Sequence, residues 1–182
     1  MRVISGKYKG RKLNSFEGDA LRPTSDRAKE AAEVILSARS NADSIGGSIE
    51  TVVCGMSGGI GSPFFESVES RLASMLFSVP AVKSVEFGIG ADFSEMLGSE
   101  ANDSFVIEEG KIRTKTNNNG GINGGITNGT PVVFSVTIKP TPSIGKEQET
   151  VNIKTKESVT AKIEGRHDPC IVPRAVPVIE AA

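Results

Sequence analysis

Residues 132–139 carry the clearest alternation of apolar and polar side chains in this sequence. The apolar positions are Val132, Phe134, Val136 and Ile138, and the positions between them are Val133, Ser135, Thr137 and Lys139. Successive side chains of a strand point to opposite faces of a sheet. The pattern therefore predicts a strand with one buried face. Residues 151–163 alternate again, which predicts a hairpin that turns near Lys156 and Glu157.

Two segments have the spacing of amphipathic helices. The first begins at Thr24 or Ser25, either of which can cap it, and runs to about Arg39. Its apolar side chains fall on one face, at Ala28, Ala31, Val34, Ile35 and Ala38.

The second predicted helix has clear start and stop signals. Ser62 is a suitable N-cap, Pro63 suits the first helical position, and Pro80 ends the run. Six apolar residues recur at helical spacing and are predicted to lie in the core: Phe65, Val68, Leu72, Met75, Leu76 and Val79.

Shorter strands complete the predicted set of elements. Residues 2–13 have the pattern of two short strands around a turn, and residues 48–56 and 82–88 each predict one strand. Antiparallel strands combined with a few amphipathic helices indicate an α+β fold.

The composition fits one loop-rich globular domain. The chain has 182 residues, 20 of them glycine, and no tryptophan. It has no apolar run of the ~20 residues that span a bilayer and no apolar core of a signal peptide, so a cytoplasmic location is predicted. Residues 1–31 carry eight Lys or Arg against four Asp or Glu. This basic arm is either an ordinary solvated surface or a nucleic-acid contact.

Few residues are available for metal or redox chemistry. Cys54 and Cys170 are far apart and belong to no Cys-x-x-Cys pair, so both are predicted to be reduced, partly buried thiols. The single histidine, His167, excludes a site that needs several imidazoles. No metal is predicted.

Three segments are candidates for binding or catalysis. The Gly/Asn-rich segment 117–129 either brings its backbone close to a ligand or is a flexible surface loop. Residues 139–143, Lys-Pro-Thr-Pro-Ser, place a cation and hydroxyls on a stiff backbone, which suits an anion or forms a simple turn. Arg166, His167 and Asp168 combine a phosphate-binding group with a possible base, or form a local ion pair at a turn.

Several longer motifs occur in a fixed order. They are Gly-Ser-Glu-Ala-Asn-Asp at 98–103, Thr-Asn-Asn-Asn-Gly-Gly-Ile-Asn-Gly-Gly-Ile-Thr-Asn-Gly at 116–129, Lys-Pro-Thr-Pro-Ser-Ile at 139–144, and Gly-Arg-His-Asp-Pro-Cys-Ile-Val-Pro-Arg-Ala-Val-Pro at 165–177. Together with matching stretches that begin at Asp43 and Ser78, they make residues 32–182 resemble the C-terminal portion of chorismate synthase.

The resemblance implies a β-α-β sandwich, usually a homotetramer, and a lyase of the shikimate pathway to the aromatic amino acids. That family uses reduced FMN to eliminate phosphate from 5-enolpyruvylshikimate 3-phosphate, which gives chorismate. It implies a proton-transfer role for Asp168 near the flavin. It also implies flavin contacts by Pro80, Ala81, Gly124, Lys139, Pro140, Thr141, Pro142, Ser143 and Arg166.

Some parts depart from that pattern. Asn119 and Asn123 stand where the family more often has Ala and Leu. The family's two catalytic histidines and its substrate-binding arginines belong to an N-terminal half that this sequence does not match, so the chain alone is predicted to be inactive.

Residues 1–31 resemble instead the start of a bacterial small-subunit rRNA guanine-N2 methyltransferase, but no Asn-Pro-Pro-Tyr or Asn-Pro-Pro-Phe motif is present to support methylation. Two segments are therefore predicted, 1–31 and 32–182, with a continuous helix across the junction. The alternatives are a non-catalytic chimeric remnant whose basic arm contacts RNA, or a gene join without selected function.

Overall fold

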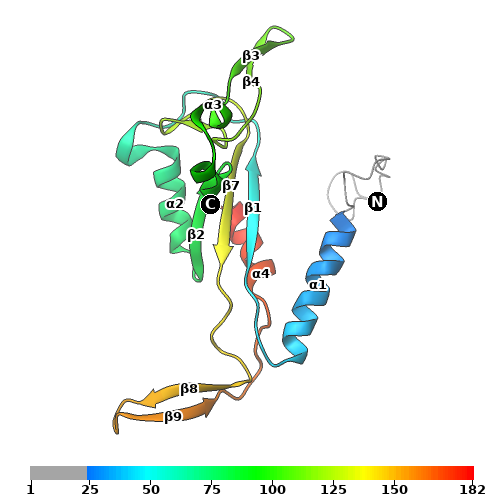
Figure 1. Cartoon of the computed structure of the whole chain (residues 1–182), viewed down its shortest axis with the longest axis vertical. Helices are drawn as coiled ribbons and strands as arrows, with labels where there is room; N and C mark the ends of the chain where they lie inside the picture. Colours follow the sequence, from blue (N-terminus) through cyan, green and yellow to red (C-terminus); the bar gives the residue numbers. More distant parts are fainter. Residues whose placement is uncertain (1–23) are drawn as a thin grey trace.

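A three-stranded antiparallel sheet forms the centre of the molecule (Figure 1). The structure is a computed structural model that describes residues 24–182. The strands lie in the order β1 (Gly47–Val53), β7 (Val132–Ile138) and β2 (Val82–Phe87). Val136 of the central strand faces Ile49 on one side and Val85 on the other. The alternation along β7 is confirmed, because its four predicted core positions are the buried ones.

Two helices cover one face of this sheet. α2 (Val68–Ser78) packs beside β2, and α4 (Val172–Glu180) packs beside β1. Leu76 of α2 and Ile179 of α4 are almost completely buried in the cluster that includes the inner face of β7. Because the opposite face carries polar side chains such as Glu50 and Ser135, the core lies on one side only. This arrangement confirms the α+β class.

The remaining elements are short or project from the sheet. They are α1 (Thr24–Ser40), η1 (Phe64–Glu66), η2 (Gly90–Glu95), α3 (Gly98–Ala101), β3 (Phe105–Glu108), β4 (Lys111–Thr114), β5 (Ile122–Asn123), β6 (Ile126–Thr127), β8 (Glu147–Asn152) and β9 (Glu157–Lys162). Figure 1 shows α1 and the β8–β9 ribbon extending away from the sheet in different directions.

The first predicted helix is confirmed, and it continues across the predicted junction without a break. Its apolar face is not part of the core, however. Val34 is 49% exposed, and of the predicted face only Ile35 and Ala38 are partly buried. The helical spacing thus predicted the element correctly but not a packing partner for it.

The start of the second helix was predicted wrongly. Pro63 has an extended backbone, Phe64–Glu66 form a 3-10 turn, and α2 begins only after Ser67. The correction also affects the predicted core, because Phe65 precedes the helix and is 92% exposed. Met75 lies within α2 but faces outward and is 45% exposed.

We expect Ser67→Ala to lower the free energy of unfolding by about 1 kcal/mol. The Ser67 hydroxyl accepts a hydrogen bond of 3.0 Å from the backbone N–H of Ser70, which would otherwise lack a partner in the first turn of α2. Ser62→Ala is the matched control and should leave stability unchanged. Urea unfolding of both variants measures the difference, and equal effects would show that Ser67 is not the cap.

The hairpin near residues 151–163 is confirmed, but its bounds differ. Its strands pair from Glu147 with Lys162 to Asn152 with Glu157, so the turn occupies residues 153–156. The Asn152 side chain accepts a hydrogen bond from the Lys154 N–H. This bond places the start of the turn at Asn152, a few residues before the predicted turn near Lys156 and Glu157. Likewise, the strand predicted over 48–56 ends at Val53. The strands predicted in residues 2–13 lie outside the described residues.

The Gly/Asn-rich segment is a packed structure and not a flexible loop. Its centre forms the small β5–β6 hairpin, and Gly120, Gly121 and Gly125 are buried. Close packing between the backbone of this segment and the backbone of neighbouring segments explains why glycines occur here. A Cβ added at Gly88, which has a φ of +59°, would lie 1.8 Å from the carbonyl oxygen of Asn118.

The molecule exposes far more surface than its size requires. Its accessible surface is 13633 Å², whereas a compact monomer of this mass exposes about 8,400 Å². Within residues 24–182, the single-sided core and the projecting α1 helix and β8–β9 ribbon contribute to this exposure. Among the described residues, no helix is both long and apolar enough to cross a bilayer.

Candidate functional site

Three loops meet where β7 ends, and they contain most of the predicted site residues. Residues 139–145 follow β7, residues 165–170 precede α4, and residues 41–46 precede β1. The Ser44 hydroxyl donates a hydrogen bond of 2.7 Å to the Thr141 carbonyl oxygen, and the Ile45 N–H donates one of 2.8 Å to the Pro169 carbonyl oxygen. These contacts hold the three loops in one place.

A glycine allows the loop at residues 41–46 to lie close to β7, and an ion pair holds that loop on the outside. A Cβ on Gly46 would lie 2.3 Å from the Ile138 carbonyl oxygen, so a larger residue would push the first loop away from β7. On the outside, Lys146 Nζ lies 2.6 Å from Asp43 Oδ2. The hydrogen bond from Lys146, helped by one from the Ser44 N–H, holds the pKa of Asp43 below its usual value.

A polar pocket of about 400 Å³ opens beside these loops. It is lined by Arg39 from the last turn of α1, by Arg166, His167, Asp168 and Pro169, and by Arg174 from the first turn of α4. The lining therefore contains three arginines and one aspartate, of which Arg174 and Asp168 are in contact. This excess of positive charge in a partly enclosed space favours the binding of an anion.

Asp168 sits at the base of this charge cluster. Its Oδ2 atom lies 3.1 Å from Arg174 Nη1, and its side chain is 29% exposed. The Oδ2 atom itself is buried and has no hydrogen-bond partner among the described residues, so the contact with Arg174 is an ion pair without good hydrogen-bond alignment. Arg174 thus compensates the charge of Asp168 without satisfying its Oδ2 atom by a hydrogen bond.

The neighbouring hydroxyls and His167 form a second group of contacts. His167 Nε2 lies 2.9 Å from the Ile163 carbonyl oxygen, which can only accept, so Nε2 carries the proton. Ser143 Oγ lies 3.3 Å from Nδ1, within hydrogen-bond distance. The Thr141 hydroxyl donates to the Asp168 carbonyl oxygen at 3.3 Å. His167 is therefore occupied as a link between two loops.

The structure brings together most, but not all, of the predicted site residues. Pro80 and Ala81 lie beside the start of the Lys139–Ser143 segment, because the Lys139 N–H donates a hydrogen bond of 2.9 Å to the Ala81 carbonyl oxygen. Arg166 and Asp168 come from the adjoining loop. Gly124 lies elsewhere: its neighbour Gly125 accepts a hydrogen bond from the Val68 N–H, at the opposite end of α2. Since α2 has 11 residues, this end lies about 16 Å along the helix from the end that precedes Pro80 and Ala81.

Two arginines of the pocket were not predicted from the sequence. Arg174 lies within the last motif, but nothing in the sequence showed that the helix after Cys170 turns it back toward Asp168. Arg39 comes from α1, whose orientation depends on the turn at residues 41–45. The thiol prediction needs a correction, because Cys54 is exposed, whereas Cys170 is buried; both are free. Within the described part of the chain, no cluster of three metal-binding side chains occurs.

Sequence comparison relates almost the whole chain to one family. Residues 9–182 match the chorismate synthase family. The chain is 51% identical over 168 residues to a chorismate synthase of Methanococcus vannielii, which covers 92% of this chain and 45% of that protein. It is 51% identical over 172 residues to that of Methanocaldococcus jannaschii, covering 94% of this chain and 46% of that protein. The chain therefore spans about half the length of these relatives.

Structural comparison agrees with the sequence. A crystal structure of chorismate synthase superimposes with a TM-score of 0.61 at 32% identity, over 65% of this chain and 36% of that one. The family match begins at residue 9; the methyltransferase-like origin of residues 1–31 and the boundary at residue 31 stay predictions. This chain belongs to the chorismate synthase family.

Proposed function

We propose that this chain supplies the flavin-side portion of a chorismate synthase site. The reaction is elimination of phosphate from 5-enolpyruvylshikimate 3-phosphate with reduced FMN, which yields chorismate. The observation that carries the proposal is the pocket lined by three arginines and Asp168, whose loop is hydrogen-bonded to the Lys139–Ser143 segment. We further propose that the working enzyme is a cytoplasmic homotetramer.

The groups around this pocket fit a phosphorylated flavin. The guanidinium groups of Arg166 and Arg174 can each donate to phosphate oxygens, and Lys139, exposed at the end of β7, adds a flexible cation. The Asp168 carboxylate, whose side chain is 29% exposed, would offer an acceptor to a ring N–H. Reduced FMN, when bound, would supply the transient electron density that helps the substrate phosphate to leave.

The protein's own groups would bind and orient the flavin and move a proton. Arg174 holds the Asp168 carboxylate in place through the 3.1 Å ion pair, and Asp168 would accept or return a proton at its carboxylate beside a bound flavin. The Thr141 and Ser143 hydroxyls tie the β7 loop to the loop that carries Arg166, so the two halves of the pocket keep their spacing.

His167 does not supply the missing acid–base chemistry. It is the only histidine in the sequence, and both ring nitrogens contact protein groups within the loops. We therefore propose that this chain binds flavin but does not turn over substrate by itself. Turnover of 5-enolpyruvylshikimate 3-phosphate by the purified 182-residue protein with reduced FMN would contradict this part of the proposal.

We expect Arg166→Ala to weaken FMN binding by about tenfold, since loss of one charge-assisted contact costs about 1.4 kcal/mol or more. Quenching of flavin fluorescence in an anaerobic titration measures the affinity. Arg71→Ala is a matched control, because Arg71 is an exposed arginine of α2 whose only described ion pair, with Glu66, spans 3.9 Å. The proposal fails if the wild-type chain does not bind FMN, or if both variants bind it equally well.

A further inference from the structure

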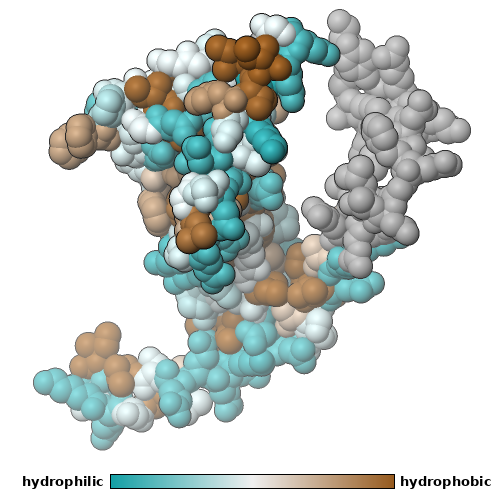
Figure 2. Space-filling view, turned by 45° about the horizontal axis from the view of Figure 1, so that its top comes forward, coloured by the Kyte–Doolittle hydropathy of each residue, from teal (hydrophilic) through white to brown (hydrophobic). Residues whose placement is uncertain are grey.

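The Gly/Asn-rich segment contains reactive side chains that neither the pocket with Arg166 nor the apolar surface residues, brown in Figure 2, account for. Three of its asparagines, Asn119, Asn123 and Asn128, are each followed by a glycine. Asparagine is one of the thermally labile residues. A following glycine favours its reaction with the backbone, because no side chain keeps the glycine nitrogen away from the asparagine amide. Asn119 and Asn123 are also the two positions at which the sequence departs from the family pattern.

The reaction of such a pair is an internal attack followed by hydrolysis. The glycine nitrogen gives its proton to water and bonds to Cγ of the asparagine. The bond from Cγ to Nδ2 then breaks, and ammonia leaves a five-membered cyclic imide. Water opens either carbonyl of the imide, which gives an aspartate or an isoaspartate. The attack therefore needs a free glycine N–H, a mobile leaving group, and a donor that stabilises negative charge on Oδ1.

Asn123 and Gly124 provide the free nitrogen at the tip of the β5–β6 hairpin. Gly124 and Gly125 have φ values of +58° and +87° and form its two-residue turn. Asn123 and Gly124 are both exposed, and no atom lies within 4 Å of the place that a Cβ on Gly124 would occupy. The Gly124 N–H has no hydrogen-bond partner among the described residues. Solvent can therefore take its proton.

The Asn128 side chain prepares the amide of Asn123 for attack. Asn128 Oδ1 accepts a hydrogen bond of 3.0 Å from the Thr130 N–H, which can only donate, so the donor end of this amide points elsewhere. Asn128 Nδ2 donates a hydrogen bond of 2.7 Å to Asn123 Oδ1. This bond stabilises the charge that grows on Oδ1 during the attack. The Nδ2 group of Asn123 makes no hydrogen bond within residues 24–182, so it can leave.

Asn119 is protected by the packing of the same segment. Its Nδ2 atom donates a hydrogen bond of 2.9 Å to Asp103 Oδ2, and the Gly120 N–H donates one of 3.0 Å to the Asn117 carbonyl oxygen. Gly120 is buried, and a Cβ there would lie 2.4 Å from the Gly88 nitrogen. Both the leaving group and the attacking nitrogen are held, so reaction at Asn119 requires local unfolding.

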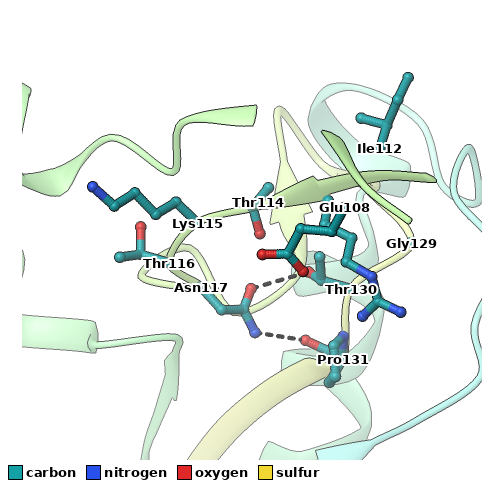
Figure 3. A pocket seen from close by; sticks show the side chains of 10 residues that line it. Glu108, Ile112, Thr114, Lys115, Thr116, Asn117, Gly129, Thr130 and Pro131 are labelled. Carbon is teal, nitrogen blue, oxygen red and sulfur yellow. Dashed lines mark hydrogen bonds between the residues drawn. The ribbon is translucent and has the colours of Figure 1, made fainter. Parts of the chain in front are cut away.

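Asn128 is protected by the bonds of its own side chain. Its amide is held at both ends, by Thr130 and by Asn123. Thr130 is itself fixed, as Figure 3 shows: its hydroxyl lies 3.0 Å from Asn117 Oδ1, and Asn117 Nδ2 donates to the Pro131 carbonyl oxygen at 2.9 Å. Cγ of Asn128 therefore cannot turn toward the following nitrogen without breaking these bonds.

We propose that Asn123 is a site of spontaneous deamidation, which the fold selects from the three Asn-Gly pairs. Aspartate at this position adds a negative charge but can still accept the hydrogen bond from Asn128. Isoaspartate adds a carbon to the main chain beside a two-residue turn, so it disrupts the pairing of β5 with β6. The inference does not rest on the proposed flavin binding, because the hairpin is separate from the pocket with Arg166.

Peptide mapping by mass spectrometry tests the selection. When the folded chain is incubated in mildly alkaline buffer, Asn123 should convert at least about tenfold faster than Asn119 or Asn128, whose reaction waits for local opening. The same incubation in denaturing urea is the control, and the three pairs should then react at similar rates. Equal rates in the folded chain, or an unmodified Asn123, overturn the proposal. A preference for Asn123 that persists unchanged in urea overturns it too, because the selection would then come from local sequence.

Asn123→Gln is the matched variant, because it keeps an amide that can accept from Asn128 but would have to close a less favourable six-membered ring. Wild type should accumulate an acidic species on ion-exchange chromatography, and the variant should form it at least about tenfold more slowly. Equal accumulation in both proteins would place the modification elsewhere and overturn the proposal. Neither measurement involves FMN, so failure here is distinct from failure of the proposed function.

Discussion

Leu76→Ala is expected to lower the free energy of unfolding by about 2–5 kcal/mol. Leu76 is fully buried near the C-terminal end of α2, where it packs in the cluster formed with β2 and β7. Truncation to alanine removes apolar contacts and leaves a cavity that the rigid sheet cannot fill. The variant should unfold at a clearly lower urea concentration, with little change in the slope of the transition.

The loss for Leu76→Ala should be a large fraction of the total free energy of unfolding. Domains are stable by only about 5–15 kcal/mol, and this one has its core on a single face of a three-stranded sheet. Phe65→Ala is the control, because it removes a larger side chain that is 92% exposed, so it should change stability by less than about 0.5 kcal/mol. A loss for Leu76→Ala no larger than that of the control would show that α2 is not docked on the sheet in solution.

Strand β7 and the segment from Phe65 to Leu76 show how far sequence patterns determine this fold. The alternation in β7 predicted its buried face correctly. Backbone geometry fixes a period of two, and four apolar residues at alternate positions can all be buried only on one face of the strand. Helical spacing around Phe65 and Leu76 was less informative. A 3.6-residue period says which residues share a face, but the extended backbone at Pro63 removes Phe65 from the helix altogether.

The site could be predicted only in part, for a related reason. Motifs locate residues along the chain, whereas a pocket depends on which loops meet. The Lys139–Ser143 and Arg166–Asp168 motifs could be located in the sequence, but the hydrogen bond from Thr141 to the Asp168 loop could not be predicted. The contribution of Arg39 was not predictable, since it depends on the direction in which α1 leaves the turn at residues 41–45. The position of Gly124 was not predictable either, since its hairpin contacts the N-terminal end of α2, far from the Lys139–Ser143 segment.

Asp103 organises the Gly/Asn-rich segment, a role that the sequence did not reveal. Its residue is only 5% exposed. Oδ1 accepts hydrogen bonds of 2.7 Å from the Thr116 hydroxyl and from the Asn118 N–H. Oδ2 accepts bonds of 2.9 Å from the N–H and the side-chain amide of Asn119. One buried carboxylate thus satisfies four donors of a segment that has few side chains able to pack.

These bonds also make the stability of the segment depend on pH. Burial by itself raises the pKa of Asp103, but the hydrogen bonds from Asn119, Thr116 and Asn118 outweigh it and hold the pKa below its usual value. A carboxylate whose pKa is lowered in the folded state contributes stability that is fully present above its unfolded value of about 3.9. That contribution is lost as the pH falls through the lower, folded pKa, because protonation then removes acceptors from the four donors.

We expect Asp103→Asn to lower the free energy of unfolding at pH 7 by about 2–4 kcal/mol, because the new amide group offers two donors where the loop requires an acceptor. Urea unfolding from pH 7 down to pH 3 measures both effects. The difference between wild type and variant should stay constant down to about pH 4 and shrink below it, as the wild-type carboxyl becomes protonated. Asp92→Asn, a substitution at an exposed aspartate in the nearby 3-10 turn, should leave stability unchanged. A difference between wild type and Asp103→Asn that does not change with pH would show that the charge of Asp103 is not what orders the segment.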